Sequence, residues 1–242
     1  MFRKRLLAYG LVSGIVCVVA ISVAAAQKNT PLAPPARGSE QGTFVLKLAG
    51  REYGTEKFSI ESAEGKLTAQ SETQLRDTET GQLIKTVSRL ILNTALEPQS
   101  YAWSEDGPAK YALSVDFTEG VAKSRLHRPN GSDDVREIHL PRNVAILDNN
   151  VLIHYEVLIR RFVETGGGKQ TFPAYIPQSA TPGTLTVQDA GMETISLGGA
   201  QRSLRHLVVL SDNAQIDLWT DGNNRLQRLY WGEPQIEAVR QP

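Results

Sequence analysis

Apolar and polar residues alternate along most of the chain. In the segment TFVLKLAGREYGTEKFSIES, Phe44, Leu46 and Leu48 share one face of an extended chain. Phe58 and Ile60 resume the alternation after the turn AGREYG. A period of two residues is typical of strands with one buried face, so this segment predicts an antiparallel hairpin.

Similar segments follow, separated by short polar turns. Turn-forming residues occupy Glu79–Gly81, Thr118–Gly120, Asp189–Gly191 and Thr220–Asn224. In FPAYIP, Pro173 and Pro177 favour an edge strand, or a strap that faces a ligand, over a central strand. Strands do not alternate regularly with helices, and no repeat of fixed period is visible. The pattern therefore predicts sequential antiparallel hairpins.

One segment, ILDNNVLIHYEVLIRRFVETGGG, breaks this pattern. Val151, Tyr155, Leu158 and Phe162 are spaced 4, 3 and 4 residues apart, which is the period of a helix with one apolar face. The core of the run, VLIHYEVLI, also suits a strand because it is rich in β-branched residues. The spacing favours the helix, and the strand stays open as the alternative.

The predicted helix has recognisable ends. Asp148, Asn149 and Asn150 are residue types that commonly cap a helix N-terminus. The three glycines Gly166–Gly168 are typical of a helix end. We therefore expect a helix at about 149–164.

These elements together predict a mainly β fold. We expect an antiparallel curved sheet or open β-barrel, with one central helix packed on its concave face. The folded part is predicted to be a single domain covering residues 43–242.

The N-terminus has the pattern of a secretory signal peptide. The basic stretch MFRKR precedes a long apolar run, and AAAQ supplies small residues for cleavage after Ala26. Residues 1–26 are the predicted signal peptide, and the Pro-rich residues 27–42 are a predicted disordered linker. We expect a periplasmic or secreted protein. An uncleaved N-terminal membrane anchor is the alternative, because the apolar run is long enough to span a bilayer.

Composition narrows the possible chemistry. Lys+Arg 26 balance Asp+Glu 26, so no basic surface for nucleic acid is indicated. The one cysteine, Cys17, lies within the predicted signal peptide. After cleavage the protein would have no thiol for a disulfide, a metal site or a nucleophile.

Catalytic motifs are missing from the sequence. It contains no G-x-S-x-G elbow and no H-E-x-x-H zinc motif. The stretch TGGGKQT departs from a phosphate loop at Val163 and at Gln170. We interpret His154 as a half-buried histidine beside the apolar stripe. We expect no enzyme, no cofactor and no metal.

Aromatic and apolar residues recur on the predicted strands and the helix. The simplest interpretation is that they fill the core of the sheet. In the functional interpretation some of them line a lipid-sized cavity, with the helix as a plug or lid. The predicted ligand-binding residues are Tyr155, Leu158, Phe162, Tyr175 and Trp219.

Two terminal segments carry a family resemblance. GTFVLKLAGREYGTEKFSI, and AQIDLWTDGNNRLQRLYW with its Trp before an Asp-Gly turn, resemble the end hairpins of secreted or periplasmic bacterial β-proteins of unknown function. These look similar to the LolA/LolB-like open-barrel lipoprotein carriers. The resemblance implies a curved antiparallel sheet around helical elements and a possible hydrophobic ligand. It transfers no catalytic residue, and GIVC is not a lipobox.

The expected function is therefore a non-catalytic protein of the bacterial envelope that binds or carries a hydrophobic or amphipathic, lipid-like ligand. The alternative is a structural or interaction protein that docks an envelope partner through exposed strands. Membrane contact is expected only through the N-terminal segment, if it is uncleaved.

Overall fold

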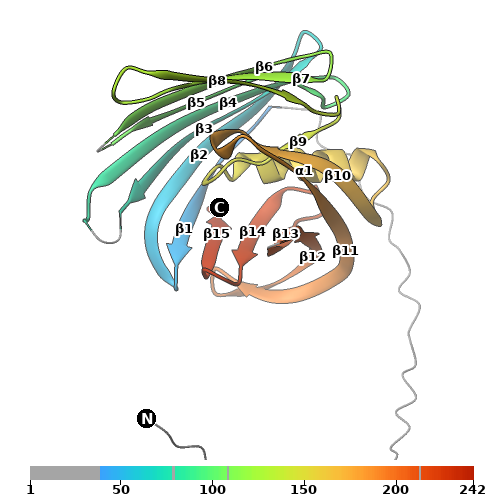
Figure 1. The fold of residues 1–242 in the computed structure, drawn as a ribbon. Helices are drawn as coiled ribbons and strands as arrows, with labels where there is room; N and C mark the ends of the chain where they lie inside the picture. The colour runs from blue at the N-terminus through green and yellow to red at the C-terminus, as the bar shows by residue number, and fades with distance from the viewer. Residues whose placement is uncertain (1–38, 78–79, 108, 213) are drawn as a thin grey trace, which may run out of the picture.

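The computed structural model describes residues 39–242, except residues 78, 79, 108 and 213 (Figure 1). The predicted signal peptide 1–26 and positions 27–38 of the predicted linker lie outside these residues. The strands are β1 (Glu40–Leu48), β2 (Arg51–Ala63), β3 (Lys66–Arg76), β4 (Leu83–Asn93), β5 (Pro98–Asp106), β6 (Lys110–Thr118), β7 (Val121–His127), β8 (Asp133–His139), β9 (Ala145–Ile146), β10 (Lys169–Ile176), β11 (Thr181–Leu197), β12 (Ala200–Leu210), β13 (Gln215–Thr220), β14 (Leu226–Trp231) and β15 (Ile236–Arg240). The helices are α1 (Ile153–Glu164) and the 3₁₀ turn η1 (Pro177–Ser179).

All described strands belong to one curved sheet, which confirms the predicted fold class. Its order is β8-β7-β6-β5-β4-β3-β2-β1-β15-β14-β13-β12-β11-β10-β9, and every neighbouring pair is antiparallel except β9 with β10. The first and last strands pair in the middle, with Val45 opposite Val239. Within the described residues the edges β8 and β9 are not joined, so the barrel is open. Figure 1 shows α1 inside the curve, between β1–β8 and β11–β15.

Alternation along the strands decides which side chains face the helix. Strand β3 is representative, because its buried positions alternate with more exposed ones along its whole length. Leu67, Ala69 and Leu75 are buried and belong to the main core. This core fills the concave side of the sheet around α1, as a sheet with one buried face requires.

The helix begins later than predicted and is capped differently. It starts at Ile153 rather than near 149, and its N-cap residue, Leu152, makes no side-chain capping bond. The carboxylate of Glu56 on β2 instead accepts hydrogen bonds from the backbone N–H groups of Leu152 (2.8 Å) and Ile153 (2.7 Å). The cap expected from Asp148–Asn150 was therefore wrong, because a buried carboxylate distant in sequence satisfies these donors. The predicted end at Gly166–Gly168 is confirmed by three glycines with positive φ.

Two further boundaries differ from the sequence prediction. Strand β1 begins at Glu40, three residues before the expected domain start at Thr43, because the Glu40 side chain is held in an ion-pair cluster under the helix. Asp189–Gly191 is not a turn but a β-bulge within β11, where Asp189 Oδ1 accepts a hydrogen bond from the Gly191 N–H (2.9 Å). The hairpin turns at Gly198 and Gly199 instead, and Figure 1 shows the strong curve of β11.

The predicted edge character of FPAYIP is confirmed in part. Strand β10 pairs with β11 along its length, but on its other side it pairs with β9 only at Ala174 and Tyr175. Pro173 lies outside this short parallel pairing, so its missing N–H costs the sheet no hydrogen bond there.

Candidate functional site

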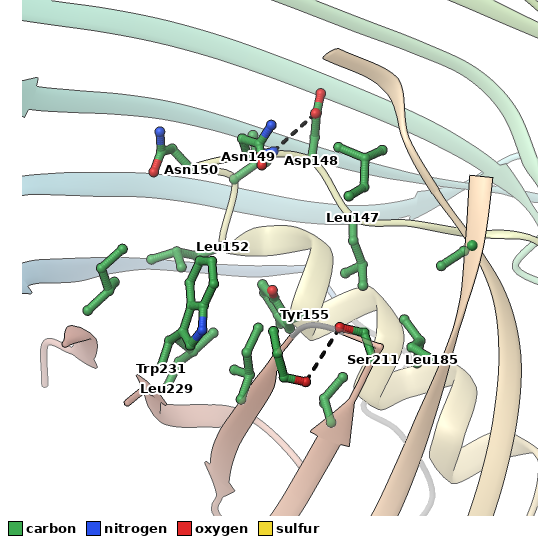
Figure 2. A pocket seen from close by; sticks show the side chains of 18 of the residues that line it. Leu147, Asp148, Asn149, Asn150, Leu152, Tyr155, Leu185, Ser211, Leu229 and Trp231 are labelled. Atoms are coloured by element: carbon green, nitrogen blue, oxygen red, sulfur yellow. Dashed lines mark hydrogen bonds between the residues drawn. The ribbon is translucent and has the colours of Figure 1, made fainter. Parts of the chain in front are cut away.

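A cavity of about 550 Å³ lies between the start of α1 and the C-terminal strands (Figure 2). The loop before the helix covers one side, and β10–β15 together with β1 and β2 form the other. Its lining residues are Leu46, Tyr53, Leu147–Leu152, Tyr155, Ala174, Ile176, Thr181–Leu185, Val209, Ser211, Asp212, Ala214, Ile216, Leu229, Trp231 and Ile236.

The cavity has an apolar floor and a polar rim. The floor includes Leu185, Val209 and Leu229, each at most 4% exposed. The rim consists of the exposed residues Asn149, Asn150, Thr181, Thr184, Ser211 and Asp212. Such a gradient can hold an apolar chain inside and a polar group at the opening.

Tyr155 contributes a hydroxyl to the lining of the cavity. Its ring comes from the first turn of α1, and Figure 2 shows it among the lining side chains. Burial raises the pKa of its hydroxyl to about 12, so the group stays protonated at any ordinary pH. Among the described residues none hydrogen-bonds this hydroxyl. It is therefore able to donate to or accept from a bound molecule.

Buried carboxylates fix the first turn of the helix beside the cavity. Glu56 is completely buried and also accepts a hydrogen bond from the Thr73 hydroxyl (3.2 Å). Burial raises the pKa of Glu56 to about 7, although its hydrogen bonds act in the opposite direction. A carboxylate at a helix N-terminus is stabilised by the exposed N–H groups and the helix dipole.

The loop before the helix is held by Asp148. Its carboxylate accepts hydrogen bonds from the Tyr101 hydroxyl (2.7 Å) and from the backbone N–H groups of Asn149 (3.0 Å) and Gln178 (3.1 Å). Burial raises the pKa of Asp148 to about 6. Both oxygens are thus used to join the loop to β5 and to η1.

An ion-pair cluster holds the middle of the helix against the sheet. Glu40 contacts Arg160 (2.5 Å) and Arg240 (2.8 Å), and Arg240 also contacts Glu156 (2.9 Å). Glu156 accepts a further hydrogen bond from the Leu226 N–H (2.9 Å). Burial, followed by the charge of Glu40, raises the pKa of Glu156 to about 8. The cluster joins β1, β14 and β15 to the helix.

His154 does not form a catalytic arrangement with its neighbours. It is completely buried, rather than half-buried as predicted, and it is not among the residues that line the cavity. Its Nδ1 accepts a hydrogen bond from the backbone N–H of Asp148 (3.0 Å). The Asp148 carboxylate is not the partner of the ring in this bond. Burial lowers its pKa to about 3, so the ring is neutral. A general base needs access to a substrate, which this ring lacks.

The described part of the chain contains no candidate metal site. No group of three His, Cys, Asp or Glu side chains there is arranged to hold an ion.

A second hollow of about 460 Å³ lies near the C-terminal part of α1 and is lined largely by the β2–β3 and β4–β5 turns, with Arg160 and Glu164. No helix among the described residues combines the length and apolarity needed to cross a membrane.

The five predicted ligand-binding residues lie in three different environments: the cavity, the main core and a second, smaller cluster. Tyr155 lines the cavity. Leu158 (2% exposed), Phe162 and Tyr175 (both 0%) lie in the main core instead. Trp219 lies in a second cluster with Ile195, Leu197 and Leu204, because its neighbour Leu218 takes the position that faces the main core.

Several lining residues were missed from the sequence. Trp231 and Ile236 flank the turn between β14 and β15, and Asn149 and Asn150 precede the helix. Apolar residues at strand ends beside a turn were the available signal for the first two. The two asparagines were interpreted as helix caps, and this concealed their place on the rim.

Comparisons with known proteins support the fold. No family model matches the chain, and no curated protein matches it. The chain is similar to a β-barrel-like protein of a domain of unknown function, DUF1849, from Brucella abortus, at 9% identity and a TM-score of 0.55 over 85% of this chain and 96% of that one. It is also matched to a DUF1089 family protein from Pseudomonas aeruginosa, at 13% identity and a TM-score of 0.45 over 82% of this chain and 92% of that one. The first likeness shows a shared β-barrel-like fold.

Proposed function

We propose that this protein is a non-catalytic component of the bacterial envelope that binds a hydrophobic or amphipathic, lipid-like ligand between α1 and β10–β15. The observation that carries this proposal is the cavity of about 550 Å³, with its apolar floor and its polar rim. Ligand pockets typically have volumes of about 300–1,000 Å³ and a few polar groups among apolar ones.

The N-terminal sequence supports the proposed location. The basic start, the apolar run and the small residues before Gln27 support export to the periplasm or the medium. In that setting a carrier role like that of the LolA/LolB-like proteins would use the open barrel to shield an acyl chain from water. Fractionation of the native host tests the location, and recovery in the cytoplasm would contradict it.

Docking of a protein partner through exposed strands is less favoured. The β8 edge carries Asp133, Asp134, Arg136 and Glu137, and three of these are paired to arginines or a lysine of the neighbouring turn and strands. Charged side chains on an edge oppose the addition of another strand.

Tryptophan quenching can test ligand binding at this cavity. Trp231 lines it, whereas Trp219 belongs to the second cluster and Trp103 to the filled part of the main core. A glycerol monoester of 11-bromoundecanoic acid carries a heavy atom that quenches tryptophan emission on close approach. We expect saturable quenching in the purified protein, at ligand concentrations below micelle formation.

Two matched variants locate the bound molecule. Trp231→Phe is expected to abolish the saturable component, and Trp219→Phe to retain it. Native mass spectrometry should show one ligand per chain. If saturable quenching is absent, or survives Trp231→Phe and disappears with Trp219→Phe, the proposed site is wrong.

A further inference from the structure

The charges around the cavity constrain the head group of a bound amphiphile. Among the described lining residues the charged ones are Asp148 and Asp212, and there is no Lys, Arg or His. Asp148 is engaged by Tyr101 and by two backbone N–H groups, whereas Asp212 is exposed on the rim. Among the described lining residues, a head group at the opening therefore meets negative charge and no cation.

The buried arginines near the helix are not available to pair with an anionic head group. Arg160 and Arg240 contact Glu40, and Arg240 also contacts Glu156. Arg161 donates to the backbone carbonyls of Asn143 and Leu96. These side chains are largely buried and committed to other groups, so turning one toward the cavity would leave an unpaired buried charge.

The helix N-terminus is also unavailable to an anion. The first backbone N–H groups of a helix form the common anion site of proteins. Here the N–H groups of Leu152 and Ile153, beside the cavity, already donate to the carboxylate of Glu56. The protein thus occupies its own anion site with an internal carboxylate.

Uncharged hydrogen-bonding groups remain for the ligand. The rim offers the side-chain amides of Asn149 and Asn150 and the hydroxyls of Thr184 and Ser211. The Tyr155 hydroxyl lies deeper, where it can meet an ester or hydroxyl oxygen near the start of the chain. These groups suit hydroxyl, ester and amide functions.

From this arrangement we infer that the cavity selects amphiphiles with an uncharged, hydroxyl- or amide-bearing head group and discriminates against anionic ones. The inference rests on the proposed function, because it names the ligand class of the same cavity. It assigns the discrimination to the negative rim at Asp212. Among the described residues that line the cavity, no cation opposes this charge, and the first N–H groups of α1 are already bonded to Glu56.

Two ligands with the same chain test the inference. The glycerol monoester of 11-bromoundecanoic acid is uncharged, and 11-bromoundecanoic acid itself is an anion at pH 8. Quenching of Trp231 measures both dissociation constants in the full protein. We expect the ester to bind at least about tenfold more tightly, the size of effect that one uncompensated charge near a rim carboxylate produces.

Charge reversal locates the discrimination. Asp212→Lys is expected to reduce the preference for the ester by about fivefold or more. Asp116→Lys is the matched control, because Asp116 is an exposed carboxylate on β6 outside the cavity, and it should leave the ratio unchanged. Tyr155→Phe should weaken the ester about five- to tenfold, as the loss of one hydrogen bond predicts.

The outcomes separate this inference from the proposed function. If the acid binds as tightly as the ester, or more tightly, the selectivity is overturned while the cavity remains a ligand site. If Asp212→Lys and Asp116→Lys give the same ratio, the assignment to the rim charge is overturned. If neither ligand quenches Trp231, the proposed function itself fails and the inference falls with it.

Discussion

At its first turn helix α1 borders an open apolar cavity, whereas along its second half its apolar side chains are buried against the sheet. Tyr155 lines the cavity, while Leu158 and Phe162, one and two turns later, are at most 2% exposed. One amphipathic stripe thus has two environments. The helix fills part of the concave face and leaves the rest open to a ligand.

Polar contacts explain how the first turn can border empty space without moving into it. Glu56 holds the N-terminal N–H groups, and Glu40 holds Arg160 farther along the helix. Apolar packing alone would favour collapse of the helix onto the floor of the cavity. Directional contacts at separated points fix the helix axis instead, so the cavity persists.

The largest expected difference between the first turn and the second half of α1 is the loss of stability when a side chain is truncated. Phe162→Ala should lower the free energy of unfolding by about 3–5 kcal/mol, because it leaves a void in a filled core. Tyr155→Ala should cost less than about 2 kcal/mol, since the ring already faces a cavity. Urea denaturation measures both. Equal losses would mean that the two ends do not differ in packing.

The second prediction concerns the polar contact at the cavity end. Burial raises the pKa of Glu56 from an ordinary value near 4.5 to about 7, so the folded state holds this proton more tightly than the unfolded state. Its contribution to stability is therefore present below about pH 4.5 and is lost as the pH rises toward 7. The loss amounts to about 3 kcal/mol at one pKa unit per 1.36 kcal/mol.

Glu56→Gln isolates this effect. Glu156, with its pKa raised to about 8, changes stability in the same direction, and His154, with its pKa lowered to about 3, changes it in the opposite one. Both groups remain in the variant, so their pH-dependent contributions cancel in the difference between the unfolding free energies of wild type and Glu56→Gln. We expect wild type to lose stability relative to the variant between pH 5 and pH 8. Parallel pH curves would show that Glu56 does not titrate in this range.

The sequence was sufficient for the architecture because strand and helix periods are local. The inward positions Phe44, Leu46 and Phe58 and the helical spacing of Tyr155, Leu158 and Phe162 were all readable, and each group lies in the predicted kind of element. The helix cap was not readable, because its acceptor, Glu56, is 97 residues from Ile153. Long-range polar contacts leave no local pattern.

The cavity residues were harder to predict because residue type says nothing about depth. Trp219 was chosen as an aromatic strand residue, yet the alternation with Leu218 places it on the other face of β13. Strict use of the two-residue period would have excluded it. Trp231 has the same chemistry and lines the cavity from the end of β14. Which core positions border empty space depends on how far the helix extends, and this is a tertiary property.

The smallest expected effect is also the most direct test of the two environments. Val115 on β6 and Val209 on β12 are both buried valines of the main core, but only Val209 lines the cavity. Val115→Phe should cost about 1–3 kcal/mol, because a filled core has no room for a larger ring.

Val209→Phe should change stability by less than about 1 kcal/mol, since its ring can enter the empty volume, and it should abolish saturable quenching of Trp231 by the brominated ester. Urea denaturation and the quenching titration measure the pair. If Val209→Phe destabilises the protein as much as Val115→Phe does, the space beside the first turn of α1 is too small to accept a side chain, and therefore too small to accept a ligand.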